Sequence, residues 1–364
     1  MLELFFDLVF VFTVTQLTTV VTDSHDVKGF VEAATILFVI WWMYDGYCWL
    51  SNNVGPTSTS TRVPMLLAMA AFLVLAIALP EAYGTDRWLF AAAYLAVVLV
   101  HAVSFQRSSM GGSARAMLGF VPINLGATGL LFVAAALPRD VRWIAWVAAS
   151  AVFVGSMVAR RESGFSIRPV HFAERHRLLL IIALGESVIA IGVSAEGHIA
   201  ETRYLVAVLL AMLLIALFWW VHFADDEHAT EALVRIERDD PTRLARVALL
   251  AFSMSYLVLV AGLIPVASGL HEVVHHPGHH LSWLAAGTLG VGTAIYLVGN
   301  SVHLWLLGLS SGWALKIAAL VALGTIPIGH EVTGDVQVVS LCVVIAVALV
   351  VSARVERRPM HQAA

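Results

Sequence analysis

Charged residues are scarce in this 364-residue chain: Asp, Glu, Lys and Arg together make up 13% of it, whereas apolar residues make up 60%. Soluble domains usually contain about 25% charged residues, so the composition predicts a membrane protein. No Walker A loop and no dinucleotide-binding fingerprint occurs, and nothing in the sequence points to nucleic-acid binding. We therefore expect neither an ATP-driven pump nor a nucleic-acid partner.

Cysteine is almost absent, since only Cys48 and Cys342 occur. Both fall inside apolar runs, where a free thiol behaves as an ordinary buried residue. We expect no disulfide, no metal site built on cysteine, and no cofactor.

Apolar runs long enough to cross a bilayer fill most of the chain. A spanning helix needs about 20 mostly apolar residues, and these runs are too long and too uniformly apolar for barrel strands. We therefore expect an all-α polytopic membrane protein with about twelve transmembrane helices. The expected segments are residues 2–22, 28–50, 63–81, 87–106, 115–137, 141–159, 176–195, 203–224, 244–267, 282–304, 311–329 and 336–353.

The basic residues predict an orientation for these segments. The first run carries an acid and is followed by no small-residue cleavage pattern, so we expect a spanning helix there and not a cleaved signal peptide. Twelve helices place both termini on one side, where the loops and tail hold fifteen arginines against five basic residues on the other side. The positive-inside rule then predicts that both termini are cytoplasmic.

The two halves of the chain show an ordered series of matches that predicts a duplication. Phe6-Asp7 aligns with Gly185-Glu186, and Trp41-Trp42 aligns with Trp219-Trp220, at offsets of 179 and 178 residues. Because six is even, two six-helix units would be parallel repeats related by an axis along the membrane normal. The expected domains are residues 1–160 (first repeat), 161–175 (cytoplasmic connection), 176–354 (second repeat) and 355–364 (cytoplasmic tail).

Asp7 and Glu186 are acids at matching places in these repeats. A carboxylate at mid-bilayer costs roughly 2.5 to 3.5 kcal/mol on insertion scales, so such groups usually face the bundle interior. Glu3 precedes Asp7 by one helical turn and shares its face. Two alternatives remain: the acids line an ion or substrate path, or they make structural hydrogen bonds to neighbouring helices.

Other polar residues inside the apolar runs complete the set of path candidates. Lys316 is a candidate counter-charge for Asp7 or Glu186, or else a residue that snorkels or bonds locally. A lone intramembrane His is more often a packed, hydrogen-bonded residue than a relay. Beyond the acids named above, the candidates are Asp45, His101, His222, His303 and Lys316.

A histidine-rich stretch, HEVVHHPGHH, occupies residues 271–280. Five imidazoles could hold a transition metal, but a His-rich loop without a fixed cysteine or carboxylate set is a weak motif. The sequence alone favours treating the loop as incidental, with no metal site.

Two stretches, LELFFDLVFVFTVTQL at residues 2–17 and HFAERHRLLLIIALGESVIAIG at residues 171–192, resemble the hallmark segments of the bacterial low temperature requirement A (LtrA) family. The resemblance implies a polytopic protein of the bacterial cytoplasmic (inner) membrane connected with growth in the cold. Phe5-Phe6-Asp7 in the first half, and Leu184-Gly185-Glu186 in the second, are also weakly similar to the F-S-D motif that opens each repeat of the potassium channels of lysosomes and bacteria. The residues that match the LtrA pattern are Glu3, Phe6, Asp7, His171, Glu174, Arg175, His176, Gly185, Glu186 and Ser187.

Three functions remain open on the sequence alone. The first is a secondary transporter or channel for a small ion or solute, with its path near the first and seventh helices. The second is a non-transporting scaffold that binds membrane lipid or a partner, with the basic stretch HFAERHR on a headgroup; homo-oligomers fit either function. The third, ranked last, is an intramembrane enzyme using His171, Glu174 and His176, whose spacing does not match a zinc-binding helix.

Overall fold

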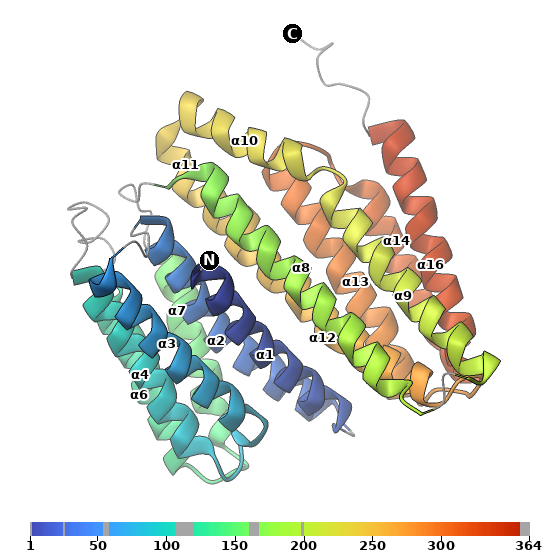
Figure 1. The fold of residues 1–364 in the computed structure, drawn as a ribbon, viewed down its shortest axis with the longest axis horizontal. Helices are drawn as coiled ribbons and strands as arrows, with labels where there is room; N and C mark the ends of the chain where they lie inside the picture. The colour runs from blue at the N-terminus through green and yellow to red at the C-terminus, as the bar shows by residue number, and fades with distance from the viewer. Residues whose placement is uncertain are drawn as a thin grey trace. The chain divides into compact units, whose positions relative to one another are not determined.

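The computed structural model describes residues 2–24, 26–53, 58–106, 119–159, 167–197 and 200–356. Every regular element within these ranges is a helix (Figure 1), which confirms the all-α expectation. Several hydroxyl side chains inside the helices are hydrogen-bonded to carbonyls of the same helix. In α1 (Leu2–Thr22), the hydroxyls of Thr15 and Thr18 donate to the carbonyls of Val11 and Val14, one turn earlier.

The chain divides into two compact units, of which the first comprises Met1–Leu179 and Glu237–Arg246. Within it α1 packs on α2 and α3, α3 on α4, α4 on α6, and α6 on α7. Its helices, besides α1, are α2 (Val27–Asn53), α3 (Thr59–Ala78), the 3-10 turn η1 (Leu79–Glu81), α4 (Arg87–Gln106), α6 (Val121–Ala136), α7 (Arg142–Ala159) and the first part of α8 (Pro169–Ser194).

The second unit comprises Leu180–Ile236 and Val247–Ala364. Here α12 packs on α13, α13 on α14, and α16 on α9 and α14. Beyond the rest of α8, the elements from residue 202 onward are α9 (Thr202–Phe223), α10 (Asp226–Asp239), α11 (Pro241–Ala248), the π-helix η2 (Leu249–Met254), α12 (Ser255–His275), α13 (Trp283–Leu306), α14 (Trp313–Gly324), α15 (Ile326–Glu331), α16 (Gly334–Val351) and the π-helix η3 (Ser352–Glu356). Residues 237–246, at the junction of α10 and α11, belong to the first unit.

Ten helices in the described residues are long and apolar enough to cross a membrane, in place of the twelve expected. The segments expected at 115–137 and 141–159 form α6 and α7, which are apolar but not among the ten. At 1.5 Å per residue the 16 residues of α6 span about 24 Å, short of a hydrocarbon core about 30 Å thick. Residues 115–118 lie outside the described residues.

The seventh expected helix begins seven residues earlier than the sequence predicted. α8 starts at Pro169, so residues 169–175, expected in the cytoplasmic connection, form its first two turns. Proline suits this place because it has no N–H to leave without a partner. The rest of the connection, up to residue 166, and residues 357–364 of the tail lie outside the described residues. The stretch HFAERH therefore lies on a helix.

The two Trp pairs differ in their surroundings. Trp41 is fully buried in the middle of α2, and Trp42 Nε1 donates to Asn124 Oδ1 at 2.9 Å. Trp219 and Trp220, near the end of α9, are both exposed. An interfacial aromatic belt therefore fits the second pair and not the first.

Glycines let α12 and α13 approach closely in the second unit. A Cβ built on Gly262 of α12 would lie 2.7 Å from Tyr296 N and 2.8 Å from Gly292 O of α13. Both are backbone atoms that no rotamer change can move. Small residues at such contacts allow close packing between helices in membranes.

We predict that Gly262→Ala destabilises the protein, by about 1 to 3 kcal/mol, because the added methyl group overpacks this contact. Gly287→Ala in α13 is the matched control, since no atom lies within 4 Å of its built Cβ. Thermal unfolding of the purified protein in detergent measures both. Equal melting temperatures for the two variants would contradict the close approach.

Candidate functional site

The first helix presents one polar face to the interior of the first unit. Phe6, Asp7 and Phe10 are buried, whereas Phe5 and Leu8 are about half exposed. This pattern follows from the helical repeat, which puts residues three and four apart on one face. Asp7 has no exposed surface, so its carboxylate needs a partner from the protein.

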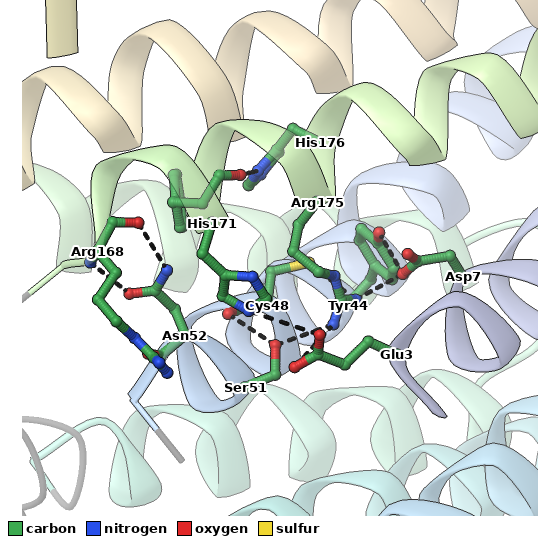
Figure 2. Close-up of polar contacts among 11 residues, drawn as sticks. Glu3, Asp7, Tyr44, Cys48, Ser51, Asn52, Arg168, His171, Arg175 and His176 are labelled. Carbon is green, nitrogen blue, oxygen red and sulfur yellow. Dashed lines mark hydrogen bonds and ion pairs between the residues drawn. The ribbon is translucent and has the colours of Figure 1, made fainter. Parts of the chain in front are cut away.

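The partner of Asp7 is Arg175, from the second turn of α8 (Figure 2). Arg175 Nη2 lies 2.5 Å from Asp7 Oδ1, and the arginine is itself only 2% exposed. Removing either partner of a buried ion pair destabilises the folded protein, because it leaves an uncompensated charge in the interior. The ion pair therefore ties α1 to α8.

Helix α2 supplies the uncharged partners of this ion pair (Figure 2). Tyr44 OH donates to the same Asp7 oxygen at 2.9 Å, and Arg175 Nη1 donates to Ser51 Oγ at 2.9 Å. Phe6 and Phe10 pack against the Tyr44 ring, with centroids 5.9 and 3.9 Å away. Three helices thus meet at one buried charge pair.

A second acid, Glu3, lies beside the same arginine (Figure 2). Its carboxylate oxygens are 3.9 Å from Arg175 Nη1 and 3.5 Å from His171 Nε2. The side chains of Glu3 and His171 retain 14% and 31% of their exposed surface. Glu3 and His171 are therefore the partly exposed members of this ionic cluster.

Asp45 and His176 form a second buried pair in the same unit. His176 Nδ1 lies 2.9 Å from Phe172 O, and its Nε2 lies 3.3 Å from Asp45 Oδ1. The other carboxylate oxygen of Asp45 accepts from Trp49 Nε1 at 3.1 Å. The Asp45–His176 pair therefore links α2 to the second turn of α8.

Asn52 holds the start of α8 against the end of α2 (Figure 2). Its side-chain nitrogen donates to Arg168 O at 3.1 Å, and its side-chain oxygen accepts from Arg168 N at 2.9 Å. Arg168 Nε also donates a hydrogen bond to the backbone oxygen of Asn52 at 2.7 Å. These contacts fix the direction in which α8 leaves its first turn and so aim Arg175 at Asp7.

Two carboxylates of this cluster converge on one guanidinium. Glu3 and Asp7 lie 3.9 and 2.5 Å from nitrogens of Arg175, and Asp45 lies 3.3 Å from His176. Among the described residues Asp7 Oδ2 and Arg175 Nε have no hydrogen-bond partner, although both atoms are buried.

The second unit contains a polar network centred on two histidines, His222 and His303. His222 Nδ1 lies 2.8 Å from Asn300 Oδ1, and its Nε2 lies 2.8 Å from Tyr256 OH. His303 Nδ1 donates to Ala251 O in η2, and its ring centroid is 5.4 Å from that of His222. The structure thus brings together two of the predicted path residues, His222 and His303.

The remaining predicted residues lie apart from these clusters. His101 is buried against Tyr47 and Phe105, and its Nε2 has no partner among the described residues. Lys316 is exposed and its Nζ donates to Ser311 O, so its observed contact is local and the cation beside Asp7 is Arg175.

Among the residues that match the hallmark pattern, Glu186 is half-buried and Glu174 and Gly185 are exposed, whereas Ser187 is buried and donates to Ala183 O. Asp7 belongs to the first unit and Glu186 to the second. Pairing of these two acids therefore stays a prediction.

Sequence reasoning missed Arg175 as the partner of Asp7. A hydropathy count treats Arg175 and its charged neighbours as a loop, although Pro169 marks a helix start ahead of them. Tyr44 and Ser51 gave no signal, because isolated hydroxyl residues are common in membrane helices. The signal that could have found the pair is the presence of Asp7 and Arg175 in the two hallmark stretches.

Ten candidate spanning helices and an ionic cluster buried among three of them define a polytopic α-helical membrane protein. The family profile described as bacterial low temperature requirement A protein (LtrA) matches residues 1–353. A protein of Rhizobium meliloti (strain 1021), Uncharacterized protein RA0937, is 27% identical over 322 residues, which cover 85% of this chain and 77% of that protein. The chain belongs to the LtrA family.

We predict that Arg175→Met lowers the free energy of unfolding by about 3 to 5 kcal/mol, because it leaves Asp7 buried without its cation. The double variant Asp7→Leu with Arg175→Met should recover part of this loss, since no charge then remains at the site. A titration with a denaturing detergent measures the free energy of unfolding of the wild type, the single variant and the double variant. Arg238→Met, at an exposed ion pair with Asp239, is the control and should leave stability unchanged.

Proposed function

We propose that this protein is a secondary transporter or channel for a small ion or solute, and that the ionic cluster of α1, α2 and α8 lies on its path. The observation that carries the proposal is the buried cluster itself, in which two carboxylates share one arginine. Ionisable groups inside membrane helices are costly and mark ion paths, proton relays and counter-ions.

The arginine shared by Glu3 and Asp7 supplies a physical means of exchange. A proton or cation that binds at Glu3 and His171 compensates Glu3 and leaves Arg175 to Asp7 alone. When it leaves, Arg175 has to serve both acids. Occupancy at the half-exposed end of the cluster is in this way coupled to the buried ion pair.

We also propose that the chain is a duplication of a six-helix unit, with both termini cytoplasmic. Each unit buries a histidine on a comparable helix: His101 of α4 lies 5.0 Å from the Tyr47 ring, and His303 of α13 lies 5.4 Å from the His222 ring. At the 178-residue offset of the Trp pairs, His222 corresponds to Tyr44. Both side chains are buried and hydrogen-bonded, Tyr44 to Asp7 and His222 to Tyr256, which supports the alignment at this position.

A non-transporting scaffold is the second candidate, favoured by the complete burial of Asp7 against Arg175 and Tyr44. A cluster serving only to join helices would look the same at its inner end. Arg175 and His176 are buried in this cluster and so are not free to hold a lipid headgroup. A scaffold would therefore have to bind its lipid or partner elsewhere.

We expect protein reconstituted in liposomes to conduct protons, Na⁺ or K⁺ down an imposed gradient, measured with a pH-sensitive dye or tracer ions. Asp7→Asn and Glu186→Gln should each reduce the flux about tenfold or more, because each removes an intramembrane acid. The control is Glu201→Gln, at an exposed ion pair with Arg203, which should conduct like the wild type.

Two results would count against transport. Folded, correctly inserted wild-type protein without flux of any of these ions would favour the scaffold. Flux that is unchanged in both Asp7→Asn and Glu186→Gln would place any path away from these acids.

A further inference from the structure

The histidine-rich loop that follows α12 is held in place by the structure. Gly278 N donates to Asp335 Oδ2 at 2.6 Å, Gly334 N donates to His279 O at 3.0 Å, and Leu281 N donates to Gly329 O at 2.9 Å. Gly278 has a φ of +80°, a conformation that favours glycine. The loop therefore has a defined backbone, which the sequence alone did not indicate.

Two imidazoles meet nitrogen to nitrogen where this loop begins: that of His275, the last residue of α12, and that of His276, which follows it. His275 Nδ1 lies 3.2 Å from His276 Nε2, and both side chains are exposed. Two nitrogens that bind one tetrahedral ion at about 2.0 to 2.1 Å lie about 3.3 Å apart. An ion between them can therefore replace the shared proton with little movement of either ring.

We propose that His275 Nδ1 and His276 Nε2 form a binding site for a divalent transition-metal ion such as Zn²⁺, Ni²⁺ or Cu²⁺. Imidazole nitrogen suits these ions, whereas Mg²⁺ and Ca²⁺ prefer oxygen ligands. No group of three His, Cys, Asp or Glu side chains in the described residues could hold an ion. The site therefore has two protein ligands, with water or a small anion in the other positions.

His271 does not make this a protease-type zinc site, although HEVVH at residues 271–275 has the letters of the H-E-x-x-H motif. His271 Nδ1 is 2.6 Å from Ser194 Oγ, and its ring centroid is 5.7 Å from that of His275. His275 instead approaches His276 more closely, with centroids 4.6 Å apart. Two ligands with open positions hold an exchangeable ion rather than a structural one.

The test is a competition titration of the full chain, purified in detergent without a polyhistidine tag and stripped of metal, against a fluorescent Zn²⁺ chelator. We expect one equivalent of Zn²⁺ to bind. His275→Gln and His276→Gln should each weaken binding about tenfold or more, since losing even an outer-shell partner of a metal ligand costs 10 to 100-fold. Cu²⁺ bound to the wild type should show coupling to two nitrogens by electron paramagnetic resonance.

His228→Gln is the matched control, because it removes an exposed histidine of α10 outside the loop and should bind Zn²⁺ like the wild type. Melting temperatures without metal should be equal in all variants, because the substituted side chains are exposed. Binding by the double variant His275→Gln with His276→Gln that equals that of the wild type would overturn the proposal. The outcome is independent of the flux measurements above.

Discussion

Arg175 and Asp7 each carry a charge that is costly to bury alone, and the local arrangement of the first unit follows from holding them 2.5 Å apart. α2 supplies the hydroxyls of Tyr44 and Ser51 that satisfy the pair, and Asn52 of the same helix fixes the start of α8. Were the contact between Asp7 and Arg175 absent, each charged group would lose its partner in an apolar interior. One ion pair thus sets where three helices meet.

The apolar helices were predictable from the sequence, because hydrophobic length is a direct consequence of the thickness of the bilayer. The start of α8 was not, since a charge-rich turn such as HFAERH reads as a loop until its charges are known to have partners inside the protein. The role of Asp7 as a buried acid was foreseen from the run FFDLVFVF, but its partner is 168 residues away. Hydropathy carries no information about contacts at that separation.

The polar centres of the two units use different chemistry. Around Arg175 the groups in contact include carboxylates and a guanidinium, whereas His222 contacts the Asn300 amide and the Tyr256 hydroxyl. The second network begins at a π-helix, a feature that frees backbone carbonyls and is frequent at functional sites. In the proposed duplication, one copy would keep a charged centre while the other holds its helices with neutral hydrogen bonds.

The separation between Asp7 and Arg175 also has a consequence for biogenesis. Asp7 leaves the ribosome 168 residues before its partner Arg175. At about 5 to 20 residues per second, that interval is roughly 8 to 34 s. During this time the carboxylate of Asp7 cannot form its ion pair with Arg175. The first unit cannot reach its final packing until the start of α8, which carries Arg175, has been synthesised.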